Sequence, residues 1–256
     1  MQLIGELLMK NVQTSDLVFH EGIPKICVPV IGVTEIEILD EFKTLSTMEM
    51  DLVEFRIDYF EYVNDELKVL YLLAKIRELY NKPLLFTLRT KKEGGASNIT
   101  DDYYFKLNNK VIKSKMVDLI DIEFFSNIDR VNKAISLAKE NQVVTILSNH
   151  DFMKTPSEED ILFKLNKMME YGDIAKIAVM SNSEEDVLTL LSCGLKLKKE
   201  KKGPFIAIAM GPFGIISRIS CELFGSCMTY ASNKNVSAPG QINVKLAKEI
   251  LKIMHI

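Results

Sequence analysis

The sequence lacks a long uninterrupted apolar run. Its longest charge-free apolar stretch, Gly203 to Ser217, is shorter than a bilayer span and contains two prolines and three glycines. The segment from Met1 to Lys10 is mostly apolar, but Glu6 interrupts it, and neither a basic region nor a small-residue cleavage site accompanies it. We therefore expect neither membrane insertion nor secretion, and we expect a cytoplasmic protein.

A surplus of charge of one sign is also missing. The 256 residues include 32 Lys plus Arg and 35 Asp plus Glu, which gives a formal net charge of -3 at pH 7. No overall basic field attracts nucleic acid or an anionic membrane, so neither is expected as a partner. With 47% hydrophobic and 26% charged residues, the composition is that of an ordinary soluble globular protein.

Cysteine and histidine are scarce. No two cysteines form a Cys-x-x-Cys pair, and no histidine stands at zinc-ligand spacing from them. A chain of this length does not need disulfides, so we expect the cysteines to be reduced and mostly buried, and we expect no metal site. The residues concerned are Cys27, Cys193, Cys221, Cys227, His20, His150 and His255.

Short apolar runs of high β-propensity recur along the chain. Their starts lie 21 to 33 residues apart (226 − 205 and 117 − 84 at the extremes), which is too wide for hairpins and fits one strand and one helix per unit. Most runs are apolar on both faces, as in a parallel sheet covered by helices. The eight runs are Ile26 to Ile31, Leu52 to Ile57, Leu84 to Leu88, Val117 to Ile122, Val143 to Leu147, Ile174 to Val179, Phe205 to Ala209 and Ser226 to Tyr230.

Four of the intervening segments begin with a helix-start pattern, in which Ser or Thr precedes Glu or Asp by three residues. The predicted caps are Thr34, Ser126, Ser157 and Ser183. Eight strand–helix units in about 250 residues predict an α/β fold, the (β/α)8 or TIM barrel. An open doubly wound sheet is the alternative, but no Gly-x-Gly-x-x-Gly turn follows the first strand.

No linker or low-complexity segment divides the chain, so we expect a single barrel domain over residues 1–256. Residues 1–24 form an extension before the first barrel strand. Within it, Leu3 to Leu8 and Val18 to His20 are expected to form a short hairpin that closes the lower mouth of the barrel.

Barrel enzymes hold their reacting groups at the carboxyl ends of the strands and in the loops that follow. Strand two ends with Glu54, Arg56 and Asp58 on one face, which suits a polar binding floor. A buried structural ion network is the alternative interpretation. Arg89 ends strand three in the same way, whereas the lysines and glycines of residues 91–95 fit a surface loop equally well.

Strands five and six bring a histidine and a lysine to the same end of the barrel. A lone histidine such as His150 is often structural, but its position favours a functional role. Lys176 is the one charged residue in the apolar run Ile174 to Val179. If it points inward, desolvation and nearby arginines favour the neutral amine, which forms an imine with a ketone or aldehyde. A partnered structural lysine is the alternative.

The loops after strands seven and eight are rich in small residues. Met210-Gly211 leads to Arg218, which suits an anion. Ala231 to Ala238, followed by Pro239-Gly240-Gln241, has the composition of a lid, or equally of a connection without function.

Six segments in register carry a family resemblance. They are Glu54-Phe55-Arg56-Ile57-Asp58; Phe86-Thr87-Leu88-Arg89-Thr90 with Glu93-Gly94-Gly95; Ser148-Asn149-His150-Asp151-Phe152; Ala175-Lys176-Ile177-Ala178-Val179-Met180; Met210-Gly211 with Gly214 and Ser217-Arg218; and Ser237-Ala238-Pro239-Gly240-Gln241. Together they resemble the type I 3-dehydroquinate dehydratases of the shikimate pathway, across nearly the whole chain. Each segment alone is weak, but six in order around a strand-six lysine are highly specific.

The resemblance implies a role for each matching residue. Lys176 forms the imine with the ketone of 3-dehydroquinate, His150 is the general acid/base, and Glu93 orients His150. Arg218 binds the substrate carboxylate. The remaining substrate-binding residues implied are Glu54, Arg56, Arg89, Ser237 and Gln241, which hold hydroxyls and close the lid, and Met180, Met210, Tyr230 and Ala238, which lie in the pocket or lid.

The implied reaction needs no metal or other cofactor, because the imine activates the neighbouring C–H bond, and its product is 3-dehydroshikimate. Two positions depart from the family pattern: Phe55 stands where Trp is common, and Ser181 where Pro often follows. The family also implies a homodimer. The alternatives are a class I aldolase with a strand-six lysine and a non-catalytic barrel that binds a small acid or another protein. An aldolase of phosphorylated substrates would place a phosphate cup after strands seven and eight, where this chain offers Arg218 and a Ser-Ala-Pro-Gly-Gln lid.

Overall fold

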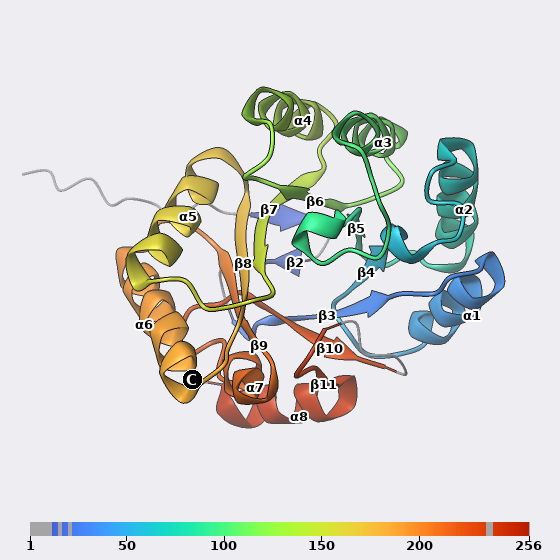
Figure 1. Ribbon diagram of the computed structural model, residues 1–256. Coiled ribbons are helices and arrows are strands. Elements are labelled where there is room, and N and C mark those ends of the chain that lie inside the picture. The colour runs from blue at the N-terminus through green and yellow to red at the C-terminus, as the bar shows by residue number, and fades with distance from the viewer. Residues whose placement is uncertain (1–11, 15–16, 20–21, 234–237, 256) are drawn as a thin grey trace, which may run out of the picture.

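The structure is a computed structural model, and it describes residues 12–14, 17–19, 22–233 and 238–255. Its centre is a curled parallel sheet surrounded by helices (Figure 1). The strands of the sheet are β3 (Lys25–Val30), β4 (Leu52–Arg56), β5 (Leu84–Thr87), β6 (Leu119–Glu123), β7 (Val144–Asp151), β8 (Ile174–Met180), β9 (Phe205–Met210), β10 (Met228–Ser232) and β11 (Ile242–Asn243). The α-helices are α1 (Glu35–Ser46), α2 (Glu66–Leu79), α3 (Asp101–Ser114), α4 (Ile128–Glu140), α5 (Glu158–Tyr171), α6 (Glu184–Glu200), α7 (Ile215–Ile219) and α8 (Val244–Met254). Three short 3-10 helices, η1 (Ile57–Tyr59), η2 (Lys91–Glu93) and η3 (Pro212–Gly214), follow β4, β5 and β9.

The sheet has the strand order of a closed (β/α)8 barrel. Strands β3 to β9 pair in sequence order, and β10 pairs with β3. The two ends meet through a parallel bridge between Phe205 and Ser226, next to which the Cys227 N–H donates to the Phe205 carbonyl at 2.8 Å. The predicted barrel of eight strands is therefore confirmed. The two-residue β11, which pairs with β10, was not predicted.

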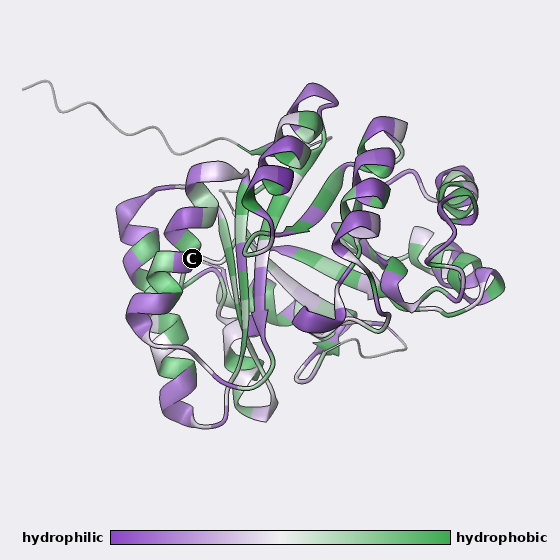
Figure 2. Ribbon diagram, turned by 45° about the horizontal axis from the view of Figure 1, so that its top comes forward, coloured by the Kyte–Doolittle hydropathy of each residue, from purple (hydrophilic) through white to green (hydrophobic). Residues whose placement is uncertain are grey.

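Alternation along the strands separates two apolar clusters. On β8, Ala175, Ile177 and Val179 belong to the larger cluster between sheet and helices. Ile174 and Ala178 belong to a second cluster inside the barrel. The central strands are accordingly largely hydrophobic, whereas the helices around them carry both hydrophilic and hydrophobic residues (Figure 2). A polar residue at an inward position of a strand therefore faces other inward residues rather than solvent.

Three of the four predicted helix caps are confirmed and one is wrong. The side chains of Thr34, Ser157 and Ser183 each accept a backbone N–H of the helix that follows. At α4 the cap is Asn127, whose side chain accepts the Arg130 N–H at 3.2 Å. The Ser126 hydroxyl instead donates to the Glu123 carbonyl at the end of β6, which moves the helix start by one residue.

A short antiparallel hairpin precedes the barrel, but with a different first strand from the predicted one. Strand β1 (Gln13–Thr14) pairs with β2 (Leu17–Val18). The predicted partner, Leu3 to Leu8, and His20 lie outside the described residues. Val12 and Phe19 flank the hairpin and pack into the cluster inside the barrel, together with inward residues of the first barrel strands. The extension thus contributes side chains that close one end of the barrel.

None of the described helices is both long enough and apolar enough to cross a lipid bilayer.

Candidate active site

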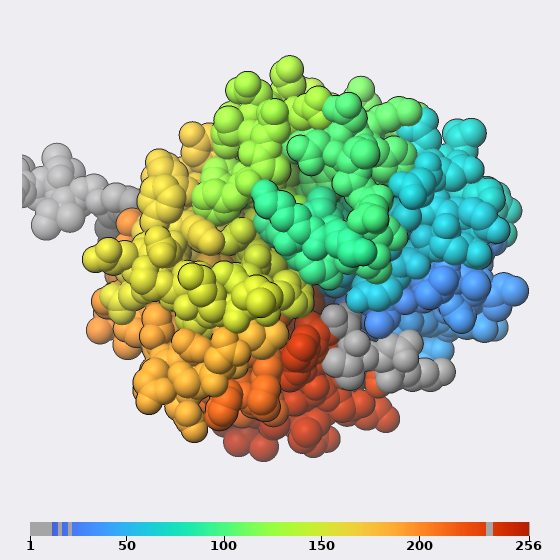
Figure 3. Space-filling model, in the orientation of Figure 1, coloured from blue at the N-terminus to red at the C-terminus, as the bar shows by residue number. Residues whose placement is uncertain are grey.

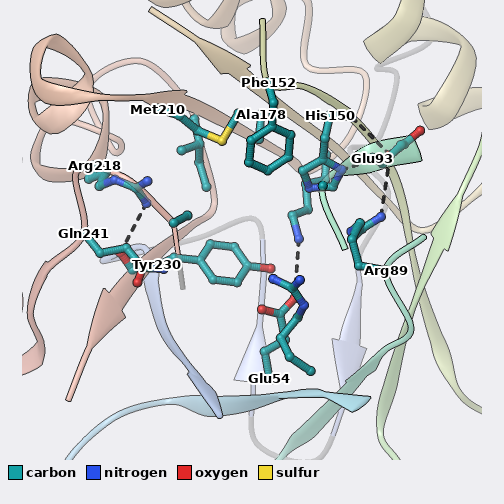
Figure 4. A pocket seen from close by; sticks show the side chains of 15 residues that line it. Glu54, Arg89, Glu93, His150, Phe152, Ala178, Met210, Arg218, Tyr230 and Gln241 are labelled. Atoms are coloured by element: carbon teal, nitrogen blue, oxygen red, sulfur yellow. Dashed lines mark hydrogen bonds and ion pairs between the residues drawn. The ribbon is translucent and has the colours of Figure 1, made fainter. Parts of the chain in front are cut away.

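A cavity opens among the carboxyl ends of the barrel strands. The loop after β5 (green), the loop after β7 (yellow) and the chain before β11 (red) meet near the centre of this face (Figure 3). Eleven of the residues that line the cavity were predicted from the sequence: Glu54, Arg56, Arg89, Glu93, His150, Lys176, Met210, Arg218, Tyr230, Ala238 and Gln241. Those labelled in Figure 4 come from elements around the whole barrel and converge on one space.

Lys176 is buried inside the barrel on β8. Its side chain occupies the inward position between Ile174 and Ala178 and is 4% exposed. The ammonium lies 3.1 Å from Asp121 Oδ2 and 3.6 Å from Glu54 Oε1. Arginines were expected near this amine, and the structure places two carboxylates against it.

Asp121, on β6, is the residue that connects the lysine to the rest of the site. Its other oxygen pairs with Arg89 at 2.7 Å and accepts the Ser148 hydroxyl at 2.6 Å. Burial alone would raise the pKa of Asp121, but Arg89 and Lys176 outweigh burial and hold this pKa well below its usual range. Asp121 therefore stays ionised throughout the physiological pH range.

Arg89 is held by carboxylates on three sides. Besides Asp121, it reaches Glu123 Oε1 at 3.1 Å and Glu93 Oε2 at 3.6 Å, and its side chain is 3% exposed. Burial disfavours its charge, but Asp121 and Glu123 keep the Arg89 pKa well above its usual value. An arginine held in this way organises the floor of the cavity.

His150 and Glu93 form an oriented pair. The Nδ1 atom of His150 lies 3.0 Å from Glu93 Oε2, and the same oxygen accepts the His150 backbone N–H at 3.1 Å. Burial, with Arg89 and Lys176 nearby, holds the His150 pKa well below its usual range, so the imidazole is neutral at pH 7. When Nδ1–H donates to Glu93, the Nε2 atom carries a free lone pair and can act as a base.

Burial also acts on the carboxyl group of this pair. It raises the pKa of Glu93 to about 7, and Arg89 opposes the shift. The carboxyl group therefore changes charge near neutral pH. Because the carboxyl group is hydrogen-bonded to the imidazole, its charge determines whether Glu93 can accept a hydrogen bond from Nδ1–H.

Phe152 and Gly94 pack around the imidazole. The Phe152 ring is nearly parallel to that of His150, with centroids 6.4 Å apart. Gly94 has φ +84°, and a Cβ at this position would come within 2.2 Å of Phe152. Only glycine therefore lets the loop after β5 approach the loop after β7 closely enough to bring Glu93 to His150.

Two of the charged side chains at the end of β4 and in η1 bond to each other. Arg56 donates from Nε and NH2 to the two oxygens of Asp58, each at 2.8 Å. Asp58 does not line the cavity, so for this residue the structural interpretation of the strand-two charges is correct. Glu54 accepts the Thr87 hydroxyl at 2.9 Å and faces Lys176.

Arg218 differs from the other buried arginines in having no acidic partner. Among the described residues, no carboxylate lies within ion-pair distance of it. It donates to the carbonyls of Tyr230 at 3.4 Å and Pro239 at 3.1 Å, and its Nε finds no acceptor there. Burial lowers the pKa of Arg218 to about 10, so the side chain still carries a positive charge at pH 7. A buried, uncompensated guanidinium in a cavity is a site for an anion.

Comparison with known proteins places this geometry in a family. The model of the type I 3-dehydroquinases matches residues 26–256. The chain belongs to the type I 3-dehydroquinase family. A 3-dehydroquinate dehydratase of Clostridium novyi (strain NT) is 46% identical over 250 residues, which is 96% of this chain and 99% of that protein. One of Clostridium botulinum (strain Eklund 17B / Type B) is 47% identical over 251 residues, 97% of this chain and 99% of that protein.

Solved structures agree with the family assignment. The type I 3-dehydroquinate dehydratase of Clostridium difficile with covalently modified comenic acid superposes with a TM-score of 0.93 at 40% identity, over 96% of this chain and 98% of that one. A 3-hexulose-6-phosphate synthase is only 14% identical at a TM-score of 0.57, a likeness that reflects the barrel alone. The match to the 3-dehydroquinases thus favours the dehydratase over the aldolase alternative.

Ser237 and Met180 are the remaining predicted site residues of this 3-dehydroquinase. Ser237 lies outside the described residues. Met180, at the end of β8, packs against the cluster inside the barrel, and its sulfur would be 3.2 Å from a Cβ on Gly211. Met180 thus continues the inward alternation of Lys176 and Ala178 and pairs in register with the cavity residue Met210, and its contact with a substrate stays a prediction.

The acidic residues of β6 were not predicted from the sequence as parts of the site. Asp121 and Glu123 alternate with Ile120 and Ile122. This is the same inward alternation that identified the charges of β4, so a signal was present. Phe152, Ile208 and Ala178 were likewise not predicted as parts of the cavity wall, although Phe152 and Ala178 lie in two of the family segments.

Proposed function

We propose that this 3-dehydroquinase dehydrates 3-dehydroquinate to 3-dehydroshikimate through an imine between Lys176 and the substrate ketone. One observation supports this above all others. A buried amine, a neutral imidazole held by a carboxyl group, and an arginine without an acidic partner open onto one cavity. These are the groups that a ketone, an acidic C–H bond and a carboxylate of one substrate require.

The first step is attack by the neutral amine of Lys176 on the carbonyl carbon. A C–N bond forms and the C=O π bond breaks. The proton that the Lys176 ammonium releases to free its lone pair then passes to the leaving hydroxyl, so that ammonium and ketone together give a protonated imine and water. Asp121 and Glu54 flank the amine at 3.1 and 3.6 Å. They hold its position and compensate the positive charge that the nitrogen carries again in the imine.

The second step is a proton transfer by His150. A protonated imine withdraws electrons from the neighbouring carbon, so Nε2 of the neutral imidazole takes a proton from that carbon. The β-hydroxyl then leaves with the proton that His150 has gained, and water is the product. Hydrolysis of the imine releases 3-dehydroshikimate and restores Lys176. Glu93 is a positioning residue here, because it holds Nδ1 and leaves Nε2 to the substrate.

The remaining residues bind the substrate. Arg218 pairs with its carboxylate, and this removes the cost of a buried guanidinium without an acidic neighbour. Hydroxyl groups of the substrate bond to the polar side chains around the floor and the lid, and Met210 supplies an apolar wall. The polar residues concerned are Glu54, Arg56, Arg89, Gln241 and, in the part of the lid outside the described residues, Ser237. In this mechanism the imine supplies the electrophilic activation, so no cofactor or metal is required.

The test is an ultraviolet assay with 3-dehydroquinate as substrate. The protein should generate the absorbance of a conjugated enone, and Lys176→Ala should reduce the rate by at least about 10⁴-fold, because Lys176 is the one lysine among the described residues that line the cavity. Lys110→Ala is the matched control, since Lys110 pairs with Glu66 outside the cavity, and it should leave the rate unchanged. Turnover by Lys176→Ala at the rate of the control would exclude the mechanism.

We also propose a cytoplasmic homodimer. The support is the family resemblance, together with large apolar side chains that α1 and α2 leave exposed, among them Ile36, Leu67 and Tyr71. Light scattering on the purified protein should give twice the chain mass of 29.1 kDa. A mass of one chain would contradict the dimer.

A further inference from the structure

The hydroxyl of Tyr230 stands out among the polar groups around the cavity. Tyr230 lies on β10, lines the cavity and is 5% exposed. Its hydroxyl oxygen has no hydrogen-bond partner among the described residues. A buried hydroxyl without a partner costs about 1 to 3 kcal/mol, and such groups are rare in folded proteins. The neighbouring acidic groups are bonded elsewhere, so the missing partner is best sought in a ligand.

The position of the ring brings this hydroxyl close to the reacting amine. Lys176 Nζ lies 4.6 Å from the centroid of the Tyr230 ring. In Figure 4 the ring projects across the cavity, with the hydroxyl end directed toward the side of Glu54 and away from Gln241. A carbonyl carbon bonded to Nζ would therefore carry its oxygen within the reach of the phenol.

Two carboxylates near this point already have partners. Glu54 Oε1 accepts the Thr87 hydroxyl and faces the lysine. Asp121 bonds to Arg89, Ser148 and Lys176. Burial and the nearby Glu54 keep the Tyr230 pKa well above its usual value, so the phenol is neutral at pH 7 and can donate a hydrogen bond. What it lacks is an acceptor oxygen.

We propose that the Tyr230 hydroxyl donates a hydrogen bond to the ketone oxygen of the substrate while Lys176 attacks the carbonyl carbon. This role rests on the proposed imine mechanism. As the C–N bond forms, the C=O π electrons move to oxygen, and the proton that leaves nitrogen ends on that oxygen. The carbinolamine hydroxyl then takes up the proton that the Lys176 ammonium released before attack, and it departs as water. Tyr230 keeps its own proton and stabilises the negative charge that develops on the oxygen in the first of these steps.

The substitution Tyr230→Phe tests this assignment, because it removes only the oxygen atom. Enzyme in excess over 3-dehydroquinate is quenched with borohydride at successive times, and the reduced adduct on Lys176 is measured by mass spectrometry. Loss of a donor to a developing oxyanion costs about 10²-fold, so the rate of adduct formation should fall by at least 10-fold and kcat should fall with it. The final yield of adduct should equal that of the unchanged protein. Tyr103→Phe is the matched control, since the Tyr103 hydroxyl donates to the Val63 carbonyl away from the cavity.

Three results would overturn the role of Tyr230. They are adduct formation by Tyr230→Phe at the rate of the control, a rise in KM with kcat unchanged, and a lower unfolding temperature in the absence of substrate. The last would mean that the hydroxyl has a structural partner in the free protein. Failure of the imine mechanism is a separate result, because the unchanged protein would then yield no adduct on Lys176 at any time.

Discussion

At the scale of single residues, the site is a buried polar network with two unfilled positions. The charges around Lys176 are compensated by Asp121 and Glu54, and those around Arg89 by acidic residues of three elements. Among the fully buried polar side-chain atoms of the described cavity residues, the Arg218 Nε and the Tyr230 hydroxyl alone lack a hydrogen-bond partner. Buried polar groups are nearly always paired, so these two atoms mark where substrate oxygens bind.

The pair of His150 and Glu93 predicts how the rate depends on pH. The burial-raised Glu93 pKa of about 7 means that the carboxylate, which accepts Nδ1–H, forms as pH rises through this value. We expect kcat/KM of the unchanged protein to rise through about pH 7. In Glu93→Gln this titration is absent, so the acid limb should move below pH 6.5, toward the lowered pKa of His150, at a lower maximum rate. Identical acid limbs in the two pH–rate profiles would contradict the assignment.

The unpaired guanidinium predicts an effect on substrate binding. Arg218→Gln removes the charge that holds the carboxylate, and the loss of a charge-assisted hydrogen bond of about 1.5 to 3 kcal/mol should raise KM by roughly 10- to 100-fold. Unfolding in urea should show no loss of stability, because a buried charge without an acidic partner is removed. Arg130→Gln is the control, since Arg130 pairs with Asp102 outside the cavity. An unchanged KM would exclude Arg218 as the carboxylate site.

Most of the cavity could be predicted at this scale, and the exceptions have physical reasons. Lys176 was recognisable because it is the one charged residue of a strand that is otherwise apolar. Its compensation by Asp121 was not recognised, because which inward residues of β6 and β8 face each other depends on the stagger of the barrel. Met180 continues the inward alternation of Lys176 and Ala178 on β8, and it packs against the cluster inside the barrel.

At the scale of elements, sequence patterns located the helices but not always their first residue. The prediction of Thr34 as the cap of α1 was correct because the pattern there offers a single candidate. Both reciprocal hydrogen bonds of the capping box form. At α4 the sequence offers two adjacent caps, Ser126 and Asn127, of similar intrinsic preference. The end of β6 decides between them, because the Glu123 carbonyl takes the Ser126 hydroxyl. That choice is tertiary and could not be predicted from local preference.

The corrected cap of α4 can be tested by a pair of substitutions. Asn127→Ala removes the acceptor of the Arg130 N–H and should lower the free energy of unfolding by about 1 kcal/mol. Ser126→Ala, one residue earlier, should cost less, because its hydroxyl has one bond to a partly exposed carbonyl. Urea unfolding of the two variants measures the difference. A larger loss for Ser126→Ala would mean that the helix begins where the sequence pattern suggested.

At the scale of the whole molecule, the regular spacing of the apolar runs was enough to predict a barrel. What it could not predict were two of the smallest pieces, β1 and β11, each of two residues, and the bounds of β2. Elements this short carry no periodicity, and their pairing depends on what the barrel leaves uncovered. Phe19 illustrates the point. It lies in an extension of unremarkable sequence, yet its ring is 1% exposed within the cluster inside the barrel.

Because Phe19 helps to close one end of the barrel, its truncation should destabilise the protein at a point far from the site. Phe19→Ala leaves a cavity in the inner cluster and should lower the free energy of unfolding by about 3 to 5 kcal/mol, while KM stays close to that of the unchanged protein. Phe163→Ala is the control, because the Phe163 side chain is 57% exposed. Denaturant unfolding and steady-state kinetics on both variants provide the comparison. A cost equal to that of Phe163→Ala would mean that the hairpin does not close the barrel in solution.

The central claim concerns the nitrogen of Lys176, and borohydride reduction in the presence of 3-dehydroquinate tests it most directly. We predict a stable adduct with the mass of the reduced imine, located by peptide mapping on Lys176 and missing from Lys176→Ala. Active enzyme that shows no such adduct, or an adduct on a different lysine, would contradict the mechanism.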